Sequence, residues 1–105
     1  MTVSYRHTMR LPGTREQISQ ACLEAVRQSG FKIRESDLAA GQISARAGVN
    51  FRSWGENIHV YVDTEDRVDI TSESRFPLTV VDWGKNRWNV TRIFARLTSL
   101  LGGDR

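Results

Sequence analysis

The chain has 105 residues, enough for one domain but too few for two separate hydrophobic cores. Hydrophobic residues make up 39% and charged residues 26%, as in ordinary globular domains, and the single cysteine excludes an internal disulfide and a cysteine-rich zinc site. The net charge of +3 is unevenly spread, because residues 56–73 hold six acidic side chains and one basic one between two basic stretches.

The N-terminal part predicts a strand followed by a helix. Residues 3–11 alternate between apolar and polar side chains, which is typical of a half-buried strand. Thr14, with Gln17 three residues later, predicts a capping box at the start of the helix. An apolar stripe at helical spacing continues to Val26, and Gly30 can adopt the left-handed conformation that ends a helix.

Four further strands are expected between the two helices. They are a short strand at Phe31 and Ile33, an alternating strand over 43–49, a strand with Ile58, Val60 and Val62 on one side, and a strand with Val68, Ile70, Ser72 and Ser74 on one side. Residues 63–66 predict a polar hairpin loop between the last two strands. Gly55 predicts a bend before the third of these four strands.

A second helix is expected from about Trp83 to Leu101. Its apolar stripe consists of Val90, Ile93, Phe94, Leu97, Leu100 and Leu101. The order is therefore β-α-β-β-β-β-α, which predicts an α+β fold: a five-stranded antiparallel sheet with two helices packed on one face. The pattern leaves the partner of the first strand open. One domain is expected over residues 1–105, with 102–105 as a frayed tail.

The junction before the last helix carries a dense set of polar residues. Asp82 is placed to cap the helix, and Gly84 permits a close approach of helix and strand. Asn86 falls inside the apolar stripe, so a buried amide there needs partners, and the hydroxyls of Ser72 and Ser74 on the preceding strand are the expected ones. We interpret these five residues as a structural junction.

The second half of the chain resembles a bacterial family known as domain of unknown function 1499. The resemblance lies in an Arg-Ser pair before a bend, a strand that ends in Ser-x-Ser-Arg, and Asp-x-Gly-x-Asn-Arg at the start of a last helix. These positions are Arg52, Ser53, Ser72, Ser74, Arg75, Asp82, Gly84, Asn86 and Arg87. The resemblance implies a bacterial protein and the fold described above. It implies no activity, because the family has none established.

The same junction also supports an alternative interpretation as an anion-binding site. Arg75 and Arg87, with Asn86 and Asp82 at the helix start, would face a phosphate or carboxylate, which free helix amides and guanidinium groups both bind. An enzyme acting on an anionic substrate would be one form of such a site. Capping and buried hydrogen bonding already account for these residues, so we favour the structural interpretation.

A second candidate surface lies on the outer face of the last helix. Lys85, Trp88, Arg92 and Arg96 are close together at helical spacing. An exposed tryptophan among cations is typical of a surface for nucleic acid or an acidic partner. The simpler alternative is a solvated face on which Trp88 stacks against Arg92. The acidic segment 56–73 and the small net charge argue against nucleic acid.

No catalytic residues, metal ligands or cofactor are predicted. His7 and His59 fall on opposite faces of their strands by parity, so they do not converge on a metal or a nucleophile. Neither Ser72 nor Ser74 lies in a nucleophile-elbow motif. Cys22 belongs to the apolar stripe of the first helix, where a buried and unreactive thiol is expected.

The leading hypothesis is a non-catalytic binding module for a protein partner or a small ligand, as a monomer or homodimer. An apolar groove between the helices, lined by Ile18, Cys22, Val90, Phe94 and Leu97, is one candidate ligand site. The same side chains would also suffice to fill that space. No apolar segment has the length of a signal peptide or a membrane span, so we expect a cytoplasmic protein.

Overall fold

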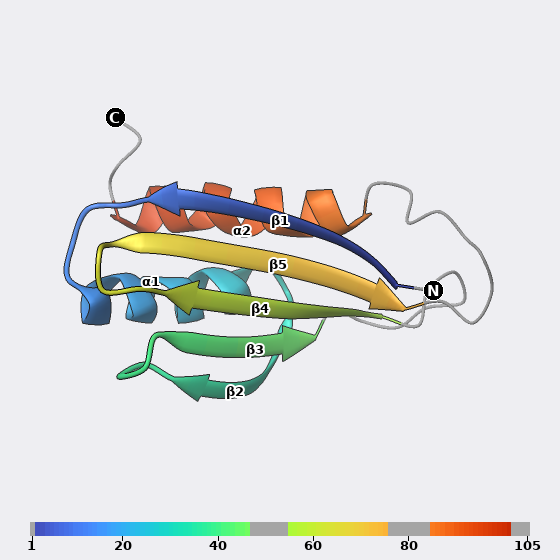
Figure 1. Ribbon diagram of the computed structural model, residues 1–105, viewed down its shortest axis with the longest axis horizontal. Coiled ribbons are helices and arrows are strands. Elements are labelled where there is room, and N and C mark those ends of the chain that lie inside the picture. Colours follow the sequence, from blue (N-terminus) through green and yellow to red (C-terminus); the bar gives the residue numbers. More distant parts are fainter. Residues whose placement is uncertain (1, 47–54, 76–84, 102–105) are drawn as a thin grey trace.

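The computed structural model describes residues 2–46, 55–75 and 85–101, which form five strands and two helices (Figure 1). In chain order these are β1 (Thr2–Arg10), α1 (Arg15–Gln28), β2 (Lys32–Asp37), β3 (Gln42–Arg46), β4 (Glu56–Val62), β5 (Arg67–Arg75) and α2 (Lys85–Leu101). The predicted α+β class and order of elements are therefore confirmed. No helix within these ranges is long and apolar enough to cross a membrane.

All five strands belong to one antiparallel sheet with the order β1-β5-β4-β3-β2. Strands β2 to β5 follow one another as a meander, joined by short turns where the chain is described. Strand β1 pairs with β5, which answers the question that the sequence left open. Consequently β1 and β2 form the two edges of the sheet, at opposite sides of Figure 1.

Both helices cover the same face of the sheet, and they lie behind the strands in Figure 1. Helix α1 packs over β2, β3 and β4, whereas α2 packs over β5 and β1 and contacts α1 along its side. The strands present alternate apolar residues to the helices, so that Ile58, Val60 and Val62 of β4 are all buried. Burial of one such side chain contributes about 1.5–3 kcal/mol.

The groove hypothesis placed five residues along its walls, and all of them are buried in one core cluster: Ile18, Cys22, Val90, Phe94 and Leu97. A hollow of about 590 Å³ does border both helices, but other residues line it, namely Glu16, Gln17, Gln20, Ala21 and Glu24 of α1 with Leu100 and Leu101 of α2. The groove is therefore not formed by the predicted residues, which belong to the core.

The start and the end of α1 follow from local sequence. The Thr14 hydroxyl accepts a hydrogen bond from the Gln17 amide at 3.1 Å, and the Gln17 side chain accepts one from the Thr14 amide at 2.9 Å. The predicted capping box is thus present. The helix ends before Ser29, and Gly30 follows with a φ of +89°, which glycine adopts without steric cost.

Two expectations about the elements need correction. Strand β2 begins at Lys32, after Phe31, and is longer than expected, because its backbone pairs with β3 although most of its side chains are exposed. Its register shifts between Ile33 and Glu35, so Arg34 is the extra residue of a bulge. Leu100 is 42% exposed and does not belong to the buried stripe of α2. Ala47, Val49 and the expected helix start at Trp83 lie outside the described residues.

The turn between β2 and β3 is held against the end of β4. Gly41 has a φ of +69°, and its carbonyl accepts a hydrogen bond from the Val62 amide at 2.7 Å. A side chain at position 41 would meet the Val62 carbonyl oxygen at 2.3 Å, so only glycine fits there. Arg15 of α1 donates to the carbonyls of Ala40 at 2.6 Å and Val62 at 2.9 Å, which ties helix, turn and strand together.

Candidate functional site

A buried polar cluster lies where the first turns of α2 pack on the sheet. It consists of Glu56 on β4, Ser72 on β5, and Asn86 and Asn89 on α2, and all four side chains are almost fully buried. Ser72 faces the helices because it follows Val68 and Ile70 at alternate positions of β5. Glu56 does so because it precedes Ile58 and Val60 in the same way on β4.

Hydrogen bonds connect the members of this cluster. The Ser72 hydroxyl donates to Asn86 Oδ1 at 2.7 Å, which is the contact that the sequence predicts. Asn89 Nδ2 donates to Ser72 Oγ and to Glu56 Oε1, each at 3.2 Å. Asn89 Oδ1 has no hydrogen-bond partner among the described residues. Buried polar groups that satisfy one another fix the position of a helix on a sheet, so this geometry supports the structural interpretation.

Sequence reasoning missed two members of the cluster, although a signal existed for each. Parity with Ile58 and Val60 places Glu56 on the inner face of β4. Asn89 lies three residues after Asn86, on the same side of the helix. A search for apolar residues does not identify a carboxylate or an amide as part of the core, so neither Glu56 nor Asn89 was predicted to be buried.

The predicted anion site is only partly within the described residues. Asp82 and Gly84 lie outside them, as do the side chains of Ser74 and Arg75. Arg87 is exposed and forms no ion pair or hydrogen bond within the described ranges. Asn86, the other predicted anion ligand whose side chain is placed, is buried and bonded to Ser72. The anion site therefore stays a prediction.

The outer surface of α2 shows a stacked pair of side chains. Trp88 is 53% exposed, and the Arg92 guanidinium lies over its ring at 4.8 Å from the ring centroid. This cation–π contact is the simpler alternative that the sequence suggests. Arg96 is exposed on the next turn, and the side chain of Lys85 lies outside the described part. The arrangement accounts for Trp88 without a partner.

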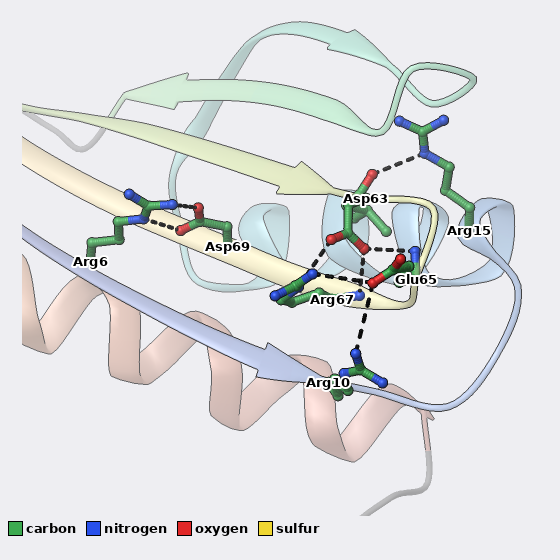
Figure 2. A network of polar contacts seen from close by, with 8 residues as sticks. Arg6, Arg10, Arg15, Asp63, Glu65, Arg67 and Asp69 are labelled. Atoms are coloured by element: carbon green, nitrogen blue, oxygen red, sulfur yellow. Dashed lines mark hydrogen bonds and ion pairs between the residues drawn. The ribbon is translucent and has the colours of Figure 1, made fainter.

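The helix-free face of the sheet divides into two halves, and the half over β1 and β5 carries ion pairs (Figure 2). The Arg6 guanidinium forms two hydrogen bonds to the Asp69 carboxylate, one of them 2.8 Å long. In the loop after β4, the Asp63 carboxylate accepts from the Arg67 side chain at 3.0 Å and from the backbone amides of Arg67 and Glu65 at 2.9 and 2.8 Å. The Arg10 guanidinium lies 3.9 Å from Glu65.

These contacts shift the protonation of the groups that form them. The backbone amide of Arg67 is the main cause that lowers the pKa of Asp63 below its ordinary value, and the Arg67 guanidinium adds to it. The hydrogen bond from Arg6 to Asp69, with the charge of that carboxylate, raises the pKa of Arg6. Both shifts favour the charged forms of Asp63 and Arg6 at neutral pH.

The other half of the helix-free face, over β2, β3 and β4, is hollowed and open. The hollow has a volume of about 680 Å³. Two cross-strand rows of outward side chains line it: Glu35, Ser44 and His59 in one row, and Asp37, Gln42 and Tyr61 in the next. The backbone between the rows, at Ser36, Ile43 and Val60, forms the floor.

The polar side chains of this hollow are largely without partners. Within the part of the chain that the structure describes, Glu35, Gln42, Ser44 and His59 make no hydrogen bond or ion pair through their side chains. Asp37 accepts one bond, from the Ala40 amide at 3.1 Å. Tyr61 is 44% exposed, and the Arg15 guanidinium approaches its ring to 5.9 Å. The hollow thus contrasts with the paired half beside it.

The two histidines and the cysteine lie as expected. His7 faces the helices and meets the ring of Phe94 edge-on, with 5.3 Å between centroids, whereas His59 faces outward. No group of three His, Cys, Asp or Glu side chains suited to a metal ion occurs among the described residues. Cys22 is buried, and this burial raises the pKa of its thiol to about 12, so the reactive thiolate is disfavoured.

With this geometry established, comparisons with known proteins support the fold. The chain is similar in fold to Ara h 8.0201. The crystal structure of that protein matches with a TM-score of 0.57 over 99% of this chain and 100% of that chain, at 8% sequence identity. No protein-family model and no curated protein sequence matches the chain. The resemblance to domain of unknown function 1499 stays a prediction.

Proposed function

We propose that the protein is a non-catalytic binding module, and that the hollow over β2, β3 and β4 is its binding surface. The observation that carries this proposal is the contrast between the two halves of the helix-free face. The half over β1 and β5 carries ion pairs, whereas the described side chains of the hollow form no ion pair and one hydrogen bond, beside an exposed tyrosine. Its volume of about 680 Å³ lies within the usual range for ligand sites, about 300–1,000 Å³.

Binding explains the hollow better than catalysis does. Ser44 and His59 are opposite each other in the register of β3 and β4, yet no hydrogen bond joins their side chains. Nucleophilic catalysis needs a base within hydrogen-bond reach of the nucleophile and a third group that orients the base. Glu35 is opposite Ser44, on the side away from His59, so it cannot orient that imidazole.

Two other proposals from the sequence are less well supported. An enzyme with an anion site at Arg75 and Arg87 would need Asp82 and the helix start, which lie outside the described residues. A nucleic-acid surface at Trp88, Arg92 and Arg96 would need a free aromatic face, and Arg92 already stacks on that ring. A bacterial, cytoplasmic protein remains part of our proposal.

A screen against the purified protein tests the proposed binding surface. Random peptides displayed on phage and a library of small polar molecules are selected for binding. We expect ligands that shift the backbone amide signals of Gln42, Ser44 and His59 in ¹⁵N-labelled protein. Binding of these ligands should weaken about tenfold, a loss of about 1.4 kcal/mol, in the double variant His59→Ala/Tyr61→Ala.

Trp88→Ala is the matched control, because it removes another exposed aromatic side chain far from the hollow in sequence. It should leave the affinity unchanged. Ligands that bind equally well to the His59→Ala/Tyr61→Ala variant, or that lose affinity with Trp88→Ala, would place the binding surface elsewhere and refute the proposal.

A further inference from the structure

Strand β2 combines three properties that belong together. It is an edge strand, its side chains are almost all exposed, and the hollow lined by the Glu35 and Asp37 carboxylates borders it on the helix-free side. In Figure 1 it is the outermost strand of the sheet, opposite β1. An edge strand leaves alternate backbone amides and carbonyls without a partner strand, and these groups can pair with another chain.

A second hollow borders β2 on its other side. It has a volume of about 500 Å³ and is lined by Leu23, Phe31 and Ile33, with Arg27 and Ser36 at its margin. Leu23, Phe31 and Ile33 are only partly buried and pack against the core. Three of the five residues that line this second hollow are apolar, and no acidic residue lines it. Ser36 of β2 lines both hollows.

The acidic side of β2 is arranged for cations. Glu35 and Asp37 are two residues apart and point to the same face, so their side chains are about 6.6–6.8 Å apart along the strand. Glu35 has no polar partner within the described ranges, and Asp37 has only the Ala40 amide. Tyr61 lies in the same hollow, and its ring already accepts one guanidinium, that of Arg15.

We propose that β2 binds an extended segment of a partner protein by strand addition, and that this segment alternates cationic and apolar residues. The inference rests on the proposed function and names the partner's chemistry. A sixth strand paired with β2 would send alternate side chains to opposite faces. Cationic side chains would lie beside Glu35 and Asp37, and apolar ones would enter the hollow formed by Leu23, Phe31 and Ile33.

A second copy of this chain fits the site less well. The other free edge, β1, also carries outward arginines, Arg6 and Arg10. Arg6 is already bound by Asp69, and Arg10 lies within ion-pair distance of Glu65. The outward arginines of β1 are therefore engaged within their own molecule, which argues against pairing of β1 with the β2 of a second copy. Pairing of two β2 strands, which carry exposed Lys32 and Arg34, is the alternative that the self-association measurement below tests.

The test uses the full chain and synthetic peptides with capped ends. One peptide of eight residues alternates lysine with valine, a second has the same composition with the lysines and valines in separate blocks, and a third alternates glutamate with valine. A fourth repeats the first with N-methyl groups on all its backbone amides, because the amides of alternate residues point to opposite edges of a strand; this removes the backbone donors but keeps both sets of side chains. Affinity is measured by fluorescence anisotropy, and the contact site by ¹⁵N spectra.

We expect the alternating lysine peptide to bind at least about tenfold more tightly than each of the other three, and to shift the amide signals of residues 33–37. In the variant Glu35→Gln/Asp37→Asn its affinity should fall about five- to tenfold, since each exposed ion pair contributes only modestly. The variant Glu16→Gln/Asp66→Asn removes the same charge away from both hollows and should bind as the wild type does.

Three results would overturn the inference. Equal binding of the N-methylated or blocked peptide would exclude strand addition, and equal binding of the glutamate peptide would exclude recognition of cations. Concentration-dependent self-association that the lysine peptide competes away would identify a second copy as the occupant. In each case, ligands from the library screen that still depend on His59 and Tyr61 would leave the proposed function standing. Loss of those ligands as well would refute both.

Discussion

At the scale of single residues, the orphaned oxygen of Asn89 marks the most sensitive point of the buried polar cluster. The side chain is 1% exposed, and its amide nitrogen faces Glu56 at 3.2 Å. The variant Asn89→Asp would place a second carboxylate against the first, out of contact with water. We expect a loss of about 3–5 kcal/mol of unfolding free energy at pH 7, as for other uncompensated buried charges.

Lowering the pH should relieve this loss, because protonation of the introduced carboxyl group removes the buried charge. Chemical denaturation monitored by near-ultraviolet circular dichroism at pH 7 and pH 5 measures the effect. If the variant is unfolded at pH 7, its native spectrum should return near pH 5. The variant Thr91→Asp, at an exposed position of the same helix, is the control, and it should change stability little. Equal stabilities of the Asn89→Asp variant at both pH values would contradict the interpretation.

Gly41 offers a second test at this scale, since two glycines with positive φ differ in their surroundings. An added methyl group at Gly41 would meet the Val62 carbonyl oxygen at 2.3 Å, whereas at Gly30 nothing lies within 4 Å. Gly30→Ala should therefore cost only the strain of the left-handed conformation, about 1–2 kcal/mol. Gly41→Ala should cost clearly more, because the turn must also move away from β4. Equal midpoints in urea for the two variants would show that the close approach does not constrain the turn.

At the scale of the elements, the capping box is the feature that the sequence predicted most completely. Thr14→Ala removes the acceptor for the Gln17 amide and should destabilise the protein by about 1 kcal/mol. For a domain of this size that corresponds to a melting temperature lower by about 4–8 °C. Thr14→Ser keeps the acceptor and should retain most of the stability. If the Thr14→Ala variant had the same melting temperature as the wild type, the capping box would contribute nothing measurable to stability.

The elements also show where sequence reasoning reached its limit. Helices and inner strands were predicted because their apolar residues repeat at periods of 3.6 and 2. Strand β2 was underestimated because an exposed edge with a bulge has no such period, so only its backbone pairing with β3 reveals it. The pairing of β1 with β5 depends on tertiary packing, and no local pattern carries it.

The candidate site was harder to predict than the fold, for the same reason. The hollow is formed by outward residues of three strands, and the register that brings Glu35, Ser44 and His59 into one row is not contained in any one of them. From the sequence, the outward faces of the strands were predicted only to be exposed to solvent. The junction was easier, since Ser72 and Asn86 break apolar patterns, and the structure joins them by a hydrogen bond.

At the scale of the whole molecule, the buried thiol links stability to alkaline pH. The Cys22 thiol is neutral in the folded core, where burial raises its pKa to about 12, whereas an exposed thiol has an ordinary value of 9.0. Above pH 9 the unfolded chain releases this proton and the folded chain keeps it. The folded state thus binds more protons, and its stability must fall as pH rises from about 9 towards 12, by at most about 1.4 kcal/mol per pH unit for one group.

The measurement compares the wild type with Cys22→Ala by urea denaturation at pH 8, 9, 10 and 10.5. The alanine variant is less stable at pH 8, because it leaves a small cavity in the core. Its stability should nevertheless fall less steeply above pH 9, so that the two curves approach each other. All other titrating groups are common to both proteins and cancel in the difference. Parallel curves would mean that the thiol ionises at the same pH in the folded and unfolded chains, and that the core around Cys22 admits water.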